Sequence, residues 1–168
     1  HTEMRALQAQ INPHFLYNSL SIINWKAIEA GEDDISRVTL DLSTYYRTSL
    51  NRGETMTTVE SEVNNIRSYL RIQLIMHDNS FRIIEDVDEA VYGCEIPKLI
   101  LQPLVENAID HGLDPSEKDD RQLWIIVKEE QDMLSFIVRD NGNGMPKEQA
   151  EQILGYQSPG YGVHNVYD

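Results

Sequence analysis

Cysteine, basic residues and long apolar runs are all scarce in this chain. Its 168 residues include a single cysteine, Cys94, so no internal disulfide can form, and no cluster of cysteine and histidine has zinc-ligand spacing. Lysine and arginine number 14 against 28 aspartate and glutamate residues, and the net charge of -14 repels nucleic-acid phosphates. No apolar run approaches the roughly 20 residues that span a bilayer. We therefore expect a chain in a reducing cytosolic setting that holds no structural metal, contacts no nucleic acid directly and does not insert into a membrane.

The first half of the chain has a helical pattern. Apolar side chains recur at helical spacing over residues 2–30, interrupted by Pro13, which we expect to kink the helix and to turn His14 outward. An acidic turn then precedes a second helix that reaches Leu50, and a third helix is predicted from Thr58 to about Met76. The two leading helices form a predicted hairpin.

The period of the apolar residues changes in the second half. Residues 81–87 predict a short strand, and Ile96 with the following proline is expected to open a helix that ends at a Gly112 cap. Two further strands are predicted over residues 123–130 and 133–140, joined as a hairpin.

Residues 141–159 are rich in glycine, asparagine and proline, which predicts a long loop typical of a lid. The order of elements predicts an α+β fold in two parts. We assign residues 1–55 to a helical region and residues 56–168 to an α/β sandwich with helices on one face of a sheet.

The segment PLVENAIDHG, residues 103–112, carries polar side chains suited to a metal and phosphates. On an α-helix, Asn107, Asp110 and His111 would share one face. An amide oxygen suits a hydrated Mg²⁺ that keeps phosphate oxygens and waters, and a histidine beside it can donate to a phosphate.

The segment DNGNGM, residues 140–145, has the chemistry for a purine base. The Asp140 carboxylate can accept a hydrogen bond from an exocyclic amine, while Gly142 and Gly144 allow the backbone to approach a flat ring closely. The two segments together are compatible with an adenine nucleotide and its metal.

His14 is a candidate nucleophile. A neutral imidazole is nucleophilic near pH 7, and the phosphoramidate that it forms is labile enough to pass the phosphoryl group on. This chemistry suits a phosphoryl relay.

Four segments resemble one family. Residues 103–112 and 140–145 resemble the N box and the G1 box of the gyrase, chaperone, histidine kinase and MutL (GHKL, Bergerat) ATP-binding superfamily, and residues 160–163 (GYGV) resemble its G2 box. Residues 10–18 (QINPHFLYN) resemble the phosphoacceptor motif of the LytS/YesM-type sensor histidine kinases. The four motifs occur in the family's order, and the resemblance extends over almost the whole chain.

This resemblance implies a role for each matched polar residue. His14 would accept the γ-phosphoryl group of ATP, Asn107 would hold Mg²⁺, and Asp140 would bond the adenine amine. Glu106 would be a polar partner near the metal or the acceptor, and His111 would lie beside the phosphates.

The resemblance also implies roles for four glycines. Gly142 and Gly144 would shape the adenine pocket, whereas Gly160 and Gly162 would hinge the lid and approach the phosphates. The family's domain continues beyond the G2 box, so we expect the ATP-binding domain to be incomplete in this chain.

Two positions depart from the wider superfamily. Hydrolytic relatives carry a glutamate four residues before the motif asparagine to activate water, and Pro103 stands there in this chain, which favours transfer to histidine over hydrolysis. Asp110 would repel a polyphosphate unless it faces solvent or helps the metal.

The resemblance implies the cytoplasmic portion of a bacterial inner-membrane sensor histidine kinase, whose membrane segments lie outside this chain. It would form a homodimer through the helical hairpin, phosphorylate His14 from Mg-ATP and pass the phosphoryl group to an aspartate of a response regulator. Two alternatives are a hydrolytic ATPase of the same superfamily and a non-catalytic dimerisation scaffold.

Overall fold

The computed structural model describes residues 12–50, 53–113 and 119–142. The chain divides into two compact units. One, the helical unit, contains His1–Met76 and Cys94–Leu99, and the other, the sheet unit, contains His77–Gly93 and Ile100–Asp168. The predicted loop lies outside the described residues from residue 143 onward.

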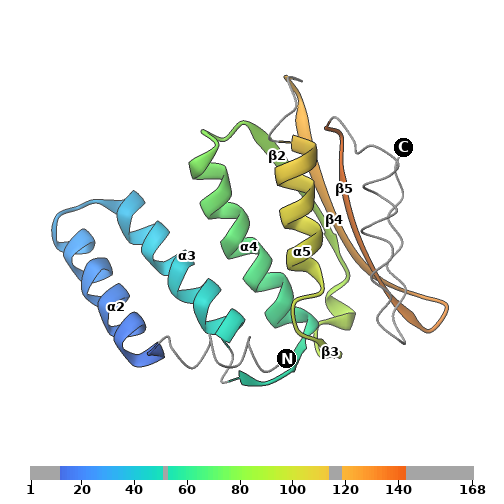
Figure 1. Ribbon diagram of the computed structural model, residues 1–168, viewed down its shortest axis with the longest axis horizontal. Helices are drawn as coiled ribbons and strands as arrows, with labels where there is room; N and C mark the ends of the chain where they lie inside the picture. Colours follow the sequence, from blue (N-terminus) through green and yellow to red (C-terminus); the bar gives the residue numbers. More distant parts are fainter. Residues whose placement is uncertain (1–11, 51–52, 114–118, 143–168) are drawn as a thin grey trace. The chain divides into compact units, whose positions relative to one another are not determined.

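Within its described residues, the helical unit contains three helices that lie side by side (Figure 1). They are α2 (Pro13–Glu29), α3 (Asp33–Leu50) and α4 (Val59–Met76). The second and third of these helices were predicted from the apolar spacing, and the structure confirms both. A two-stranded antiparallel ribbon, β1 (Met56–Thr58) with β3 (Glu95–Pro97), completes the unit.

The expected kink at Pro13 is wrong. Asn12 has an extended backbone, and its side chain accepts a hydrogen bond from the N–H of Phe15 at 3.3 Å, so it caps the helix. Pro13 is therefore the first residue of α2, where its missing N–H breaks no helical hydrogen bond. The earlier part of the helix predicted over residues 2–30 lies outside the described residues.

Buried polar side chains connect α3 to α4. The Asp41 carboxylate is 6% exposed, and its Oδ1 lies 2.8 Å from Nε of Arg71. The Asn65 amide, 2% exposed, donates to the hydroxyl oxygens of Thr48 and Ser49, both at 2.8 Å. Because such bonds require particular partners, they fix which turn of α3 faces which turn of α4.

The helix that was expected to open at Ile96 begins later. Ile96 pairs with Thr57 in the β1–β3 ribbon, and the N–H of Lys98 donates to the Thr55 carbonyl at 2.9 Å. Helix α5 (Leu101–Asn107) starts only after this ribbon ends. The prediction failed because the strand depends on a partner far away in the sequence.

A buried glutamate lies beside the end of β3. Glu62, 3% exposed, accepts a hydrogen bond from the N–H of Leu99 at 3.3 Å. Leu99 has φ of 60°, in the left-handed region that bulky residues rarely adopt. Burial lowers the pKa of the Lys98 amine, and the carboxylates of Glu62 and Glu54 oppose that shift.

The described part of the sheet unit contains three strands in the order β2-β4-β5 (Figure 1). They are β2 (Phe81–Val87), β4 (Arg121–Glu130) and β5 (Met133–Asp140), and all three predicted strands are confirmed. Strand β2 runs parallel to β4, whereas β4 and β5 form an antiparallel hairpin. Its turn residues, Gln131 and Asp132, have φ of 50° and 62°, as a two-residue hairpin turn requires.

Helix α5 and the π-helix η3 (Ala108–Leu113) contact the sheet, and a short 3₁₀ helix, η2 (Glu89–Val91), follows β2. Alternate residues of β4 are buried, namely Leu123, Ile125 and Val127. This period of two is that of a strand with one face against a core. Among the described residues, no helix has both the length and the apolar character needed to cross a membrane.

The Asp41–Arg71 pair predicts a measurable stability difference. Arg71→Ala leaves the buried Asp41 carboxylate without its cation, and we expect the free energy of unfolding to fall by about 1–3 kcal/mol. Urea denaturation followed by circular dichroism measures the change. The exposed pair of Arg37 with Asp34, 3.8 Å apart, is the control, and Arg37→Ala should change the stability by less than about 0.5 kcal/mol. Equal losses in the two variants would contradict the role given to Arg71.

Candidate functional site

The candidate site of the sheet unit begins on α5. Leu101 and Val105 are fully buried and anchor this short helix, and Pro103 lies in its first turn, where an N–H would have no helical partner. On a half-buried face, Nε2 of Gln102 donates to Oε1 of Glu106 at 2.8 Å. This bond orients the Glu106 carboxylate.

Asn107 is the last residue of α5. Its side chain is half-buried, and within the described parts of the chain it makes no side-chain hydrogen bond. A partly buried amide without a partner is unfavourable for the protein alone and favourable for binding a polar ligand or a hydrated cation. The amide oxygen is also a ligand type that Mg²⁺ accepts, which makes Asn107 compatible with the implied metal.

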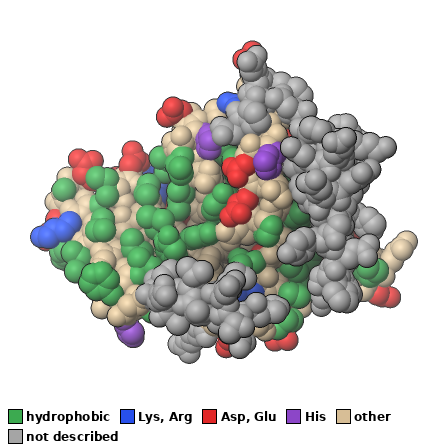
Figure 2. Space-filling view, viewed as in Figure 1, with side chains coloured by type: hydrophobic (Ala, Val, Ile, Leu, Met, Phe, Trp, Pro, Cys, Tyr) green, Lys and Arg blue, Asp and Glu red, His purple; other side chains and the backbone are tan. Residues whose placement is uncertain are grey.

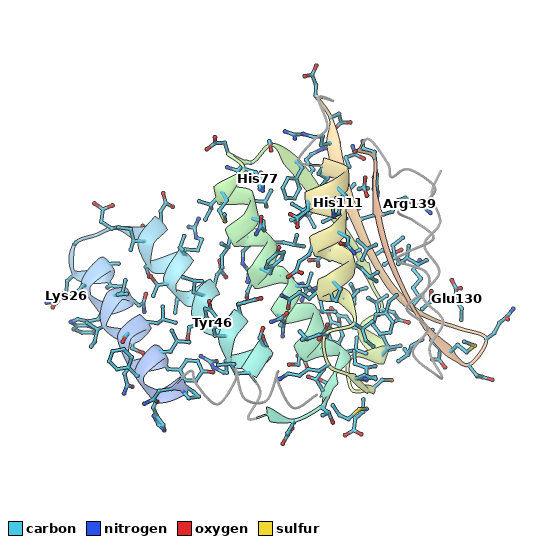
Figure 3. The ribbon with its side chains drawn as sticks, viewed as in Figure 1. Lys26, Tyr46, His77, His111, Glu130 and Arg139 are labelled. Carbon is cyan, nitrogen blue, oxygen red and sulfur yellow. The ribbon has the colours of Figure 1, made fainter. Side chains whose placement is uncertain are left out.

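The helix widens after Asn107 into the π-helix η3. Its hydrogen bonds join residues five apart, so residues 108–113 do not follow the α-helical spacing on which the shared face of Asn107, Asp110 and His111 was predicted. Asp110 and His111 are both exposed, and Figure 3 shows His111 at the end of this helix. π-helical turns are frequent at functional sites.

Gly112 brings the two predicted motifs into contact. A Cβ atom built on Gly112 would lie 2.5 Å from Cγ of Asp140 and 2.7 Å from its Oδ2. A Cβ on Gly142 would lie 2.9 Å from Cα of Gly112 and still closer to the Gly112 carbonyl group. Neither position has room for a side chain, because the end of η3 lies directly against the end of β5.

Gly112 therefore has another role than the predicted helix cap. The described glycines with a left-handed backbone are Gly31 and Gly53, and Gly112 is not one of them. It lies inside η3 and is buried. Glycine is required at position 112 for close packing and not for its φ angle.

Asp140 ends β5, opposite Leu123. Its Oδ1 accepts a hydrogen bond from the N–H of Gly142 at 2.9 Å, which turns the backbone away from the strand. Within the described residues Oδ2 takes no hydrogen bond, and Asp140 is half-buried.

The sequence did not single out two further residues that shape this site. The side chain of Asn141 bonds to the backbone at the start of β4, and Nη1 of Arg121 donates to the Leu113 carbonyl at 2.8 Å. An asparagine after a strand often bonds to nearby backbone, so Asn141 carried a weak signal. No sequence pattern indicated that the Arg121 side chain donates a hydrogen bond to the end of a helix.

The other predicted site residues lie elsewhere. His14 is exposed in the first turn of α2 and belongs to the helical unit. Gly144, Gly160 and Gly162 lie outside the described residues. Within the sheet unit, the structure thus brings together the N-box end and the start of the G1 box.

Two family models match the chain in succession. The first, described as histidine kinase, matches residues 2–81. The second, described as histidine kinase-, DNA gyrase B-, and HSP90-like ATPase, matches residues 95–166. Helices followed by a sheet with a helical layer agree with the predicted α+β fold class, which is confirmed.

Several curated proteins are similar over most of the chain. Sensor histidine kinase YesM of Bacillus subtilis is 38% identical over 98% of this chain and 28% of its own length. Sensor histidine kinase YpdA of Escherichia coli is 35% identical over 98% of this chain and 29% of its own length. Sensor protein LytS of Enterococcus faecalis is 35% identical over 88% of this chain and 25% of its own length.

The chain spans between a quarter and three tenths of the length of these relatives. The two family models follow each other in the order that the four motifs predicted. The chain belongs to the LytS/YesM-type sensor histidine kinases and carries their histidine kinase region followed by a GHKL-type ATP-binding domain.

Proposed function

We propose that this chain phosphorylates His14 with the γ-phosphoryl group of Mg-ATP and passes that group to an aspartate of a response regulator. The observation that carries the proposal is the contact of Gly112 with Asp140. It lies at the end of the sheet unit that carries the Asn107 amide and Oδ2 of Asp140, two polar groups that take no side-chain hydrogen bond from the described residues. A single nucleotide needs this combination, an acceptor for its base and a metal ligand for its phosphates.

Each residue has a defined task in this proposal. Oδ2 of Asp140 accepts from the adenine amine, the Asn107 amide oxygen holds Mg²⁺, and His111 donates to a phosphate. Mg²⁺, when bound, neutralises charge on the phosphate oxygens. Glu106, oriented by Gln102, lies next to Asn107 as a polar neighbour of the metal.

His14 supplies the acceptor. An unprotonated ring nitrogen attacks the γ-phosphorus, the bond from that phosphorus to the β–γ bridging oxygen breaks, and ADP leaves. Since His14 is exposed at the start of α2, it is accessible to the nucleotide domain and then to a response regulator. The aspartate of the regulator takes the phosphoryl group in the second transfer.

The helical unit supports dimerisation. Figure 2 shows hydrophobic side chains over the surface that α2 and α3 form. Four large apolar residues of α2 are between 56% and 74% exposed, namely Phe15, Ile22, Trp25 and Ile28. Two hairpins that bury such faces against each other make a four-helix bundle. We propose residues 1–55 as the dimerisation and phosphoacceptor region and residues 56–168 as the ATP-binding region.

We place this chain on the cytoplasmic side of a bacterial inner-membrane sensor, because its relatives are named as sensor proteins.

Pro103 stands where hydrolytic members of the superfamily carry a catalytic base, and Pro103 has no group that could activate water. Transfer to His14 is therefore favoured over hydrolysis. Asp110 is exposed, so its carboxylate can face solvent and need not repel a bound polyphosphate.

Replacement of His14 tests the acceptor. With γ-labelled ATP and Mg²⁺, the protein should acquire a label that acid removes, as a phosphoramidate requires, and His14→Gln should abolish it. The matched control is His77→Gln, a histidine outside the motifs, which should keep the label. Persistent labelling of the His14 variant would refute the assignment.

Replacement of Asp140 tests base recognition. Asp140→Asn removes the charged acceptor of the adenine amine, and we expect ATP affinity to fall by about 10- to 100-fold, since hydrogen bonds to charged groups contribute about 1.5–3 kcal/mol. Calorimetric titration measures the change. Asp132→Asn is a control in the exposed hairpin turn, where asparagine tolerates the positive φ of 62°. An unchanged affinity in the Asp140 variant would exclude this role.

Replacement of Asn107 tests the metal ligand separately. Asn107→Ala removes the amide oxygen, so the Mg²⁺-dependent labelling of His14 should fall by about 100-fold or more, as loss of a positioned charge-stabilising group does. ATP binding measured in EDTA should change by less than about twofold, because the metal is then absent from both proteins. If Asn107→Ala weakened ATP binding equally with Mg²⁺ and in EDTA, Asn107 would contact the nucleotide itself and its role as a metal ligand would be refuted.

A further inference from the structure

The side chain of Asn141 fastens the end of β5 to the start of β4. Its Oδ1 accepts from the N–H of Gln122 at 2.7 Å, and its Nδ2 donates to the Asp120 carbonyl at 2.6 Å. Its own N–H donates to the Gln122 carbonyl at 3.3 Å. These bonds continue the β4–β5 pairing by one residue beyond the pair of Leu123 and Asp140.

The same short segment also holds the end of η3. Nη1 of Arg121 donates to the Leu113 carbonyl at 2.8 Å, and Arg121 lies between the two residues that Asn141 bonds. Residues 120–122 are therefore a common anchor. They hold η3 through Arg121 and the residue after Asp140 through Asn141.

The packing around Asp140 limits its movement in one direction. The backbones of Gly112 and Gly142 are already too close for a Cβ atom, so Asp140 cannot move further toward η3. Movement away from η3 would separate Asn141 from the start of β4 and break two side-chain hydrogen bonds. Steric contact on one side and hydrogen bonds on the other thus determine where Oδ2 lies.

We propose that Asn141 is a positioning residue for adenine recognition and that Arg121 assists it. The inference rests on the proposed function, in which Oδ2 of Asp140 accepts from the adenine amine. Asn141 does not touch the base; it keeps Oδ2 at the distance and angle that the amine requires. Asparagine suits this task because it supplies one acceptor and one donor to adjacent backbone groups, whereas aspartate would lose the donor.

The test compares ATP with purine riboside triphosphate, which is ATP without its amine. The wild-type protein should bind ATP more tightly than the analogue, and Asn141→Ala should weaken ATP binding by about 10-fold with little change for the analogue. The KM for ATP in His14 labelling should rise in parallel, while kcat stays within about twofold. A merely structural role would weaken both nucleotides equally and would overturn the proposal.

A double variant shows whether Asn141 acts through Asp140. If it does, Asp140→Asn with Asn141→Ala should bind ATP as weakly as Asp140→Asn alone, and additive losses would contradict the inference. Lys128→Ala is the matched control. It breaks the 2.6 Å ion pair between Lys128 of β4 and Asp86 of β2, and it should leave the ratio of the affinities for ATP and for the analogue unchanged.

A substitute variant covers a folding failure, and two binding results separate failure of the proposed function from failure of the positioning role. If Asn141→Ala does not fold, Asn141→Asp, which keeps the acceptor for Gln122, is measured by the same criteria. If the wild-type protein binds ATP no better than the analogue, the role of Asp140 in the proposed function fails. If the wild type prefers ATP and the folded Asn141 variant keeps that preference in full, only the positioning role fails.

Discussion

The sheet unit depends on one close approach, that of the Gly112 backbone to the Asp140 carboxylate. There is no room for a Cβ atom at position 112 or at position 142, so the end of η3 and the end of β5 meet through backbone and a single carboxylate. The π-helical turn, the Arg121 bond to Leu113 and the Asn141 bonds all lie around this contact. Backbone packing thus fixes the site, and in the described part of the chain the proposed ligand groups, the Asn107 amide and Oδ2 of Asp140, take no side-chain hydrogen bond.

The helical unit buries several polar side chains beside its apolar core and exposes large apolar side chains on α2. Asp41 and Asn65 are buried between α3 and α4, whereas Phe15 and Trp25 are exposed on α2. Buried polar pairs contribute little net stability, but they discriminate between alternative packings of two helices. Exposed apolar residues of this kind mark an interaction surface, and in the proposed dimer a second copy of the hairpin covers it.

Sequence reasoning succeeded where a local pattern determines structure. Helices α3 and α4 follow from apolar spacing, and the three strands follow from period-two residues and a hairpin turn. It failed for β3, because Ile96 becomes part of a strand only through a distant partner, Thr57. It misread Pro13 because the capping bond from Asn12 makes that proline a starting residue. The π-helix was not predictable, since it accompanies the contact of Gly112 with another element.

The candidate site was predicted by residue type but not by geometry. Asn107 and Asp140 stood out because amide and carboxylate groups suit a metal and an amine, whereas Asn141 bonds to backbone groups, which every residue has.

Gly112 and Gly142 have a consequence for how this sequence can change. Since a methyl group at position 142 would overlap the backbone at position 112, and one at position 112 would overlap Asp140, neither position accepts a larger residue unless the helix end and the strand end move apart.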